Sequence, residues 1–158
     1  RGLHMNYVMD FVRNEILMSA ALSWGLAQVI KTIIHLIVTK KFVAERLIGS
    51  GGMPSCHSAT VCALTTSIII NEGIHSPFFA MSAILAIIVM YDARGVRRET
   101  GIQATVLNEM IEIVEKLGAD VSYDEKLKEF IGHTPLQVLV GAIFGIFVAM
   151  VYCLLIIR

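Results

Sequence analysis

Residues 51–60 bring together the residue types that phosphate chemistry requires in one short segment. The segment is Gly-Gly-Met-Pro-Ser-Cys-His-Ser-Ala-Thr and leads into an apolar stretch. Glycines let backbone N–H groups approach an anion, and Ser55 or Ser58 can cap a helix whose positive end attracts negative charge. His57 adds a proton donor that titrates near neutral pH. A capped helix start without a ligand is the alternative interpretation.

Two further polar clusters interrupt the apolar sequence. One holds a carboxylate and three arginines, and the other is Gly-His-Thr-Pro at residues 132–135. Their charged and histidine members are Asp92, Arg94, Arg97, Arg98 and His133. One histidine can attack phosphorus while the other protonates the leaving oxygen, and arginines can hold the phosphoryl oxygens. The clusters therefore predict phosphoryl transfer, with a positive-inside anchor as the alternative role of the arginines.

The spacing of the histidines does not favour a metal site. They lie far apart in sequence, no His-x-x-x-His pair is present, and the neighbouring charge is mostly cationic. Metal ligands instead gather anionic or neutral donors around the ion. We therefore expect neither a metal nor another cofactor.

The composition indicates an integral membrane protein with one domain. Of the 158 residues, 56% are apolar and 16% are charged, whereas soluble domains have about 45–50% and about 25%. Residues 1–4 resemble a cloning scar before Met5, so we expect residues 5–158 to form a single membrane-embedded domain. With a formal net charge of zero, membrane lipids are the expected partners and nucleic acid is not.

Four apolar stretches predict an all-α, polytopic transmembrane bundle. The expected spans are residues 16–39, 57–71, 78–91 and 135–157. Residues 103–116 predict an amphipathic helix, and residues 124–130 a short polar helix. With four spans, the loop 40–56 and the connection 92–134 lie on the same side. The three polar clusters are therefore expected to meet at one membrane face.

Lys31 lies within the first apolar stretch and shares a helix face with Gln28 and His35. An ionisable residue at membrane depth is costly, so we expect Lys31 to face the interior and the polar clusters. The alternative is that it snorkels toward the membrane surface near Lys40.

The three clusters resemble the motifs of a known superfamily. Pro-Ser-Cys-His at residues 54–57 resembles the Pro-Ser-Gly-His motif of type 2 phosphatidic acid phosphatases and vanadium haloperoxidases. His-Thr-Pro-Leu-Gln-Val-Leu-Val-Gly at residues 133–141 resembles their His-x-x-x-Asp-Val-x-x-Gly motif. The longer strings at 51–60, 90–98 and 132–135 resemble the divergent bacterial and plant branch of this superfamily.

The resemblance runs from about residue 28 to residue 145 and implies a metal-independent phosphatase. It implies that His133 is the nucleophile, which forms a phosphohistidine, and that His57 is the general acid. The phosphate ligands that it implies are Ser55, Ser58, Lys31 and Arg97 or Arg98.

The chain also departs from the superfamily's pattern. The Lys-x6-Arg-Pro motif and the Ser-Arg before the nucleophilic histidine are absent. Gln137 stands where the acidic partner of His133 belongs. An amide can orient an imidazole but cannot stabilise imidazolium as a carboxylate does. Asp92 or Glu129 is the candidate replacement.

These observations predict hydrolysis of a lipid phosphate monoester or diphosphate, such as an isoprenoid phosphate, at the membrane surface. The alternatives are a non-catalytic membrane protein that binds anionic lipid or phosphate, and a small transporter component. Most of the chain's 13 lysines and arginines lie on the side of the predicted site. The positive-inside rule then puts the site on the cytoplasmic face, in a bacterial inner membrane. Gly141 and Gly145 form a small-xxx-small pattern that could join copies into a homo-oligomer.

Overall fold

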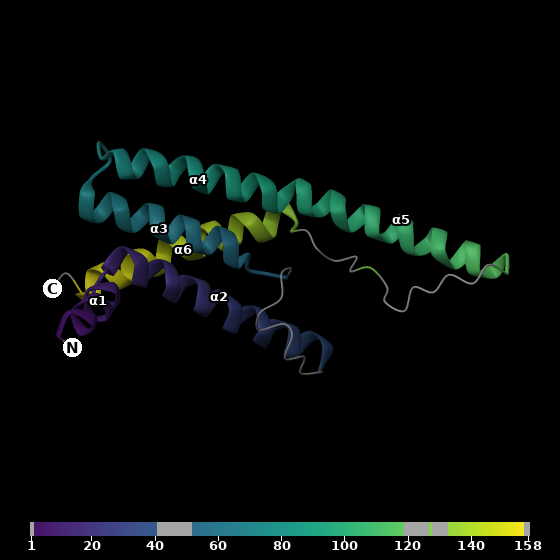
Figure 1. Ribbon diagram of the computed structural model, residues 1–158, viewed down its shortest axis with the longest axis horizontal. Coiled ribbons are helices and arrows are strands. Elements are labelled where there is room, and N and C mark those ends of the chain that lie inside the picture. Colours follow the sequence, from purple (N-terminus) through teal and green to yellow (C-terminus); the bar gives the residue numbers. More distant parts are fainter. Residues whose placement is uncertain (1, 41–51, 119–126, 128–132, 157–158) are drawn as a thin grey trace.

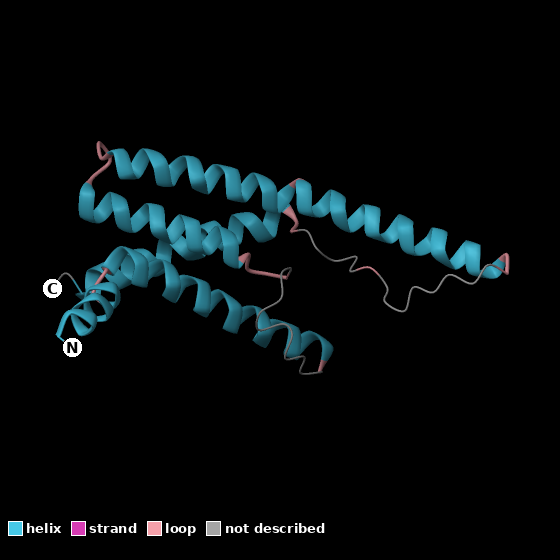
Figure 2. Ribbon diagram, viewed as in Figure 1, coloured by secondary structure: helices cyan, strands magenta, loops and turns pink. Residues whose placement is uncertain are grey.

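We analysed a computed structural model of the chain. It describes residues 2–40, 52–118, 127 and 133–156, without the side chains of residues 2–6, 96–98 and 156. These residues form helices and no strand (Figure 2), which confirms the all-α prediction. The helices are α1 (Gly2–Val12), α2 (Glu15–Thr39), α3 (Cys56–Glu72), α4 (Pro77–Arg94), α5 (Val96–Lys116) and α6 (Pro135–Ile156).

Helices α2, α3, α4 and α6 form one bundle, with α3 at its centre because it packs against each of the other three. α2 and α4 run toward one end of the bundle, and α3 and α6 run back from that end (Figure 1). α2, the α4–α5 stretch and α6 are long and apolar enough to cross a membrane. α3 has 17 residues. Helices lie over all four predicted spans, but α3 is not among the three that are long and apolar enough to cross a membrane. The protein is a helical membrane bundle.

Short polar residues define where two of these helices begin. The side chain of Asn14 accepts a hydrogen bond from Leu17 N at 3.0 Å and caps α2. Ser76 caps α4 by accepting from Phe78 N at 3.1 Å, and Pro77 occupies the first helical position. Asparagine and serine satisfy the free N–H groups of a helix start, and proline has none to satisfy.

Gly141 and Gly145 allow α6 to lie against α3. A Cβ atom on Gly141 would collide with the carbonyl oxygen of Ser55, and one on Gly145 with that of Ala59. Small residues allow such close approach between helices in membranes. The small-xxx-small pattern was offered above for a contact between copies. In the structure, α3 of the same chain lies against both glycines.

We expect Gly145→Ala to lower the free energy of unfolding by about 1–3 kcal/mol, because the added methyl must displace the α3 backbone. Gly25→Ala is the matched control, since a Cβ atom at this position in α2 meets no atom within 4 Å. Its stability should be unchanged or slightly higher, because alanine favours helix. Denaturant titration in detergent measures both variants. Equal stability of the two would contradict the close α3–α6 contact.

α5 begins directly after Gly95 and continues beyond the bundle (Figure 1). The sequence analysis placed its start at residue 103, whereas the helix begins at Val96. Asn108 donates to Leu127 O and accepts from Leu127 N, both at 3.0 Å, which holds Leu127 beside α5. The predicted polar helix 124–130 lies outside the described residues apart from Leu127. α1 was not predicted.

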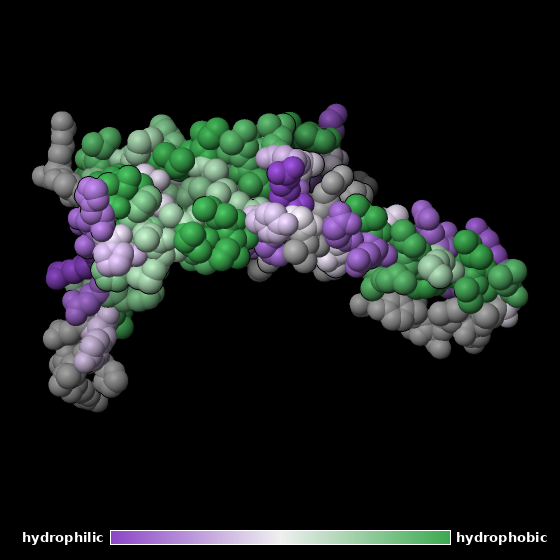
Figure 3. Space-filling view, turned by 90° about the horizontal axis from the view of Figure 1, so that it is seen from above, coloured by the Kyte–Doolittle hydropathy of each residue, from purple (hydrophilic) through white to green (hydrophobic). Residues whose placement is uncertain are grey.

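The surface of the bundle separates into apolar and polar zones. Viewed from above, hydrophobic residues cover the middle of the bundle, and hydrophilic residues gather at both of its ends, one of them the polar zone where α4 meets α5 (Figure 3). The exposed apolar side chains of α4 include Phe78, Met81, Ile84 and Ile88. Such a surface suits contact with lipid, and the polar zone marks the end of the bundle to which the site residues belong.

Candidate functional site

Backbone hydrogen bonds join the three polar clusters at one end of the bundle. Ser55 N donates to Gln137 O at 3.1 Å, which ties the start of α3 to the first turn of α6. His133 N donates to Ala93 O at 3.2 Å, which ties the segment before α6 to the last turn of α4. Segments far apart in the sequence therefore meet at the expected single end of the bundle.

The two histidines of these clusters lie close together. The ring centroids of His57 and His133 are 6.2 Å apart, and the ring planes are nearly perpendicular at 89°. His133 is buried, with 1% of its surface exposed, whereas His57 is half-buried. The pair therefore has one ring enclosed by protein and one that reaches the edge of the site, close enough for both to contact one phosphoryl group.

Ser55 caps the start of α3 beside this pair of histidines. Ser55 Oγ accepts from Ser58 N at 3.4 Å, and Ser58 Oγ donates to Ser55 Oγ at 3.1 Å. Both serines are fully buried. Their hydroxyls hold the first turn of α3 in shape, and the positive end of this helix favours an anion beside it.

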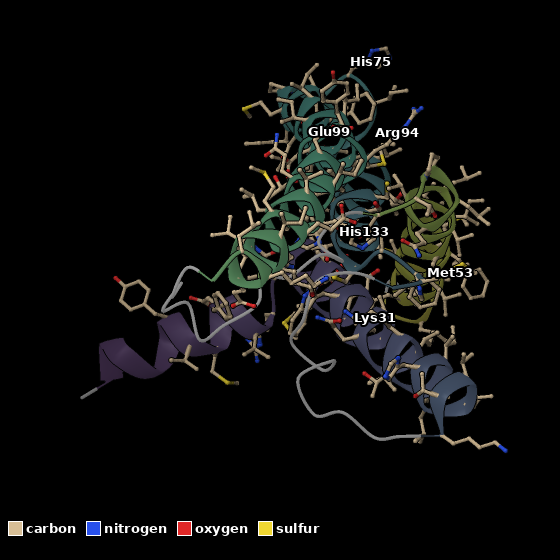
Figure 4. All side chains as sticks on the ribbon, turned by 90° about the vertical axis from the view of Figure 1, so that its right-hand side faces the viewer. Lys31, Met53, His75, Arg94, Glu99 and His133 are labelled. Carbon is tan, nitrogen blue, oxygen red and sulfur yellow. The ribbon has the colours of Figure 1, made fainter. Side chains whose placement is uncertain are left out.

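Lys31 lies inside the bundle beside the same turn. Its exposed fraction is 3%, and Figure 4 shows it on the inner part of the bundle end, as it does His133. A Cβ atom on Gly52 would lie 3.0 Å from Lys31 Cγ and 3.2 Å from its Cδ. Gly52 has a φ of 88°, a conformation that favours glycine. The expectation of an interior Lys31 is confirmed, and the snorkelling alternative is wrong.

Gln137 has a different role from the one that its motif position implied. Its Oε1 accepts from Thr134 N at 3.0 Å, while Thr134 Oγ1 accepts from Gln137 N at 3.3 Å. This reciprocal pair is a capping box, and it starts α6. The amide oxygen is therefore engaged at the helix start rather than as an acceptor for His133. The Thr-x-x-Gln spacing was the signal that the sequence analysis missed.

We expect Gln137→Ala to lower the free energy of unfolding by about 0.5–2 kcal/mol, because it removes one half of the capping box. Gln137→Glu should have the same free energy of unfolding as the wild type. Glutamate completes the same capping box, and its negative charge is favourable at a helix start. Gln103→Ala, at an exposed position of α5, is the control. A loss of stability in Gln137→Glu as large as in Gln137→Ala would contradict the capping role.

The structure describes some of the remaining predicted site residues and not others. Asp92 is half-buried on the last turn of α4, next to the carbonyl that accepts the His133 N–H. Arg94 is exposed and points outward (Figure 4). The Arg97 and Arg98 side chains and the whole of Glu129 lie outside the described part of the chain. Two carboxylates, Asp92 and Glu129, were predicted as partners of His133. Of these, Asp92 is the one that the structure describes, and it adjoins the residue whose carbonyl accepts the His133 N–H.

Within the described ranges, no three His, Cys, Asp or Glu side chains gather into a group that could hold a metal ion. Cys56 lies beside the site, with its Sγ 3.7 Å from His57 Nδ1. Among the described residues, this end also carries two imidazoles, serine hydroxyls, backbone N–H groups and the Lys31 ammonium, beside the Asp92 carboxylate. The donor groups among these suit an oxyanion.

Comparisons with known proteins agree with this description. The profile of the Divergent PAP2 family matches residues 12–148. A protein of Bacillus subtilis (strain 168) described as "Uncharacterized membrane protein YuiD" is 40% identical over 152 residues, which cover 90% of this chain and 96% of that protein. No solved structure matches the chain.

Proposed function

The chain belongs to the Divergent PAP2 family, and from this premise we propose that it hydrolyses a lipid phosphate monoester or diphosphate at the membrane surface. The observation that carries the proposal is the approach of His57 and His133, with ring centroids 6.2 Å apart. The buried Lys31 and the capped start of α3 lie at the same end of the bundle. Two imidazoles beside a cationic, donor-rich site are the groups that phosphoryl transfer through a covalent intermediate needs.

In the first step, a ring nitrogen of His133 attacks phosphorus and the bond between phosphorus and the lipid oxygen breaks. His57 gives its proton to the leaving oxygen, so the lipid departs as an alcohol, or as a monophosphate when the substrate is a diphosphate. His133 becomes a phosphohistidine. Lys31 and the N–H groups of α3 stabilise the charge on the phosphoryl oxygens.

In the second step, neutral His57 takes a proton from water, and the resulting hydroxide oxygen attacks phosphorus. The bond between phosphorus and His133 breaks, and inorganic phosphate leaves. We assign Arg97 or Arg98 to the phosphoryl oxygens. We assign Asp92 to orienting His133 and stabilising its cationic form, the role that a carboxylate performs beside a catalytic histidine.

The bundle gives the two parts of a lipid phosphate separate environments. The apolar surface of the helices suits the lipid tail, and the polar end of the bundle suits the head group (Figure 3). We propose that this end faces the cytoplasm of a bacterial inner membrane, because most lysines and arginines of the sequence fall in residues 40–56 and 92–134, the two connections predicted on its side. We include isoprenoid phosphates among the candidate substrates.

The proposal is tested by phosphate release from a panel of lipid phosphates and diphosphates, with the protein in detergent or liposomes and a chelator present. We expect release from at least one substrate and no dependence on added metal. A reaction quenched with alkaline detergent should also contain a phosphorylated protein whose label is stable in base and lost in acid, as a phosphohistidine requires. Absence of release from every substrate would contradict the enzyme proposal.

Non-catalytic binding of anionic lipid or phosphate is a second candidate function. The observation that favours it is the capping role of Gln137, at the position where the resemblance implies a carboxylate. Binding of anionic lipid that weakens with salt, without turnover of any substrate, would support this second function over the first.

A further inference from the structure

Gln28 is a buried amide that the chemistry described above does not use. Its exposed fraction is 5%. Its Oε1 has no hydrogen-bond partner among the residues that the structure describes. Buried polar atoms are nearly always hydrogen-bonded, because leaving one unsatisfied is costly. A partner that the structure does not contain would account for this amide.

Gln28 lies next to the phosphate end of the bundle. It precedes Lys31 by three residues on α2, which makes the two side chains neighbours on one helix face. Ala27, its neighbour in the chain, packs against Cys56 and Ala59 in the first turn of α3. Gly52 packs against Lys31 one turn further along α2. This turn of α2 therefore lies beside the capped start of α3.

We propose that Gln28 Oε1 accepts a hydrogen bond from a protonated oxygen of the phosphoryl group bound between Lys31 and the start of α3, an assignment that rests on the proposed function. The Lys31 ammonium and backbone N–H groups only donate and suit the ionised oxygens, whereas an amide also has an acceptor. Gln28 Oε1 can therefore bond the P–O–H group for which those donors offer no acceptor. The ligand that fits is a tetrahedral oxyanion, either free phosphate or a lipid phosphate head group.

The assignment is tested by the dissociation constants of inorganic phosphate and of a short-chain lipid phosphate. We expect Gln28→Leu to weaken binding of both about 10- to 100-fold, the usual effect of losing a hydrogen bond to a charged group. Thr32→Val is the matched control. Thr32 is buried on the same helix, and its hydroxyl bonds the carbonyl oxygen of Gln28 within α2 at 2.8 Å. Loss of the Thr32 hydroxyl should leave the dissociation constants of both ligands unchanged.

A second variant covers the case in which Gln28→Leu fails to fold. Gln28→Glu has nearly the same shape, and its carboxylate should repel the phosphoryl oxygens and weaken binding at least as much. Binding of both ligands by Gln28→Leu or Gln28→Glu at the wild-type level would overturn the assignment, as would absence of phosphate binding by the wild type. An effect confined to the lipid phosphate would also overturn it, because Gln28 would then contact the lipid portion.

Turnover measured in parallel separates this inference from the proposed function. Release of phosphate with the same KM by the wild type and Gln28→Leu would overturn the role of Gln28 and leave the phosphatase standing. Phosphate binding that depends on Gln28 in a protein without turnover would support the role of Gln28 and contradict the phosphatase.

Discussion

Replacing His133 with alanine should reduce phosphate release to the background rate, because His133 supplies the nitrogen that attacks phosphorus in the proposed reaction. Of the two imidazoles that lie together at the site, His57 is assigned to proton transfer, which leaves His133 for the attack. The phosphorylated protein should also disappear from reactions quenched with alkaline detergent. Release from the best wild-type substrate, with the protein in liposomes and a chelator present, measures the first effect, and retention of label on the protein measures the second.

The control for this prediction is His75→Ala. His75 is exposed in the turn between α3 and α4, and Figure 4 shows it far from His133. The substitution at position 133 keeps the backbone N–H that bonds Ala93 O, so the attachment of α6 to α4 should survive. His133→Asn offers a second test with a polar side chain in the buried position. Wild-type release by either His133 variant would rule out this nucleophile.

The sequence predicted the helices well because apolar length and helix caps are local properties. The four long apolar stretches correspond to α2, α3, α4 and α6, and capping serines precede α3 and α4. The start of α5 was missed because residues 92–99 are polar and resemble a loop. The structure interrupts the helix there only at Gly95, whose φ is −93° and ψ is −82°.

Contacts between distant segments were harder to predict. The burial of Lys31 followed from the cost of a charge in the membrane, a cost that does not depend on the neighbours of the residue. The small-xxx-small pattern of Gly141 and Gly145 indicated close helix contact, but such a pattern does not say which helix is the partner. The structure identifies α3 of the same chain.

The sequence offered candidate site residues where charge or a motif gave a signal, and it did not indicate the contacts of the neutral amides. Gln137 was interpreted through a motif, while its hydrogen bonds with Thr134 follow from local helix chemistry. Gln28 has no charge, so its place in an apolar stretch did not assign it a function, and only its burial and unsatisfied Oε1 indicate one. Neutral polar residues in a membrane bundle thus need the structure for their interpretation.

Replacing His57 with alanine should slow phosphate release by about 10²–10⁴, the usual contribution of a general acid or base. The loss in the first step, formation of the phosphohistidine, should depend on the leaving group. A lipid alcohol leaves as a strongly basic alkoxide unless it is protonated, whereas nitrophenolate is weakly basic and leaves without a proton. His57→Ala should therefore form the phosphohistidine from a nitrophenyl phosphate at a rate much closer to the wild-type rate than from a lipid monoester.

Single-turnover kinetics sharpen this result, because His57 serves both steps of the proposed reaction. With the nitrophenyl ester, formation of the phosphohistidine should stay fast in His57→Ala while its hydrolysis becomes slow. A burst of nitrophenolate and accumulation of phosphorylated protein should follow. Cys56→Ala is the control, because it changes the residue whose Sγ lies 3.7 Å from His57 Nδ1 and keeps the imidazole. Equal losses for both leaving groups, without a burst, would show that His57 positions the substrate instead of transferring a proton.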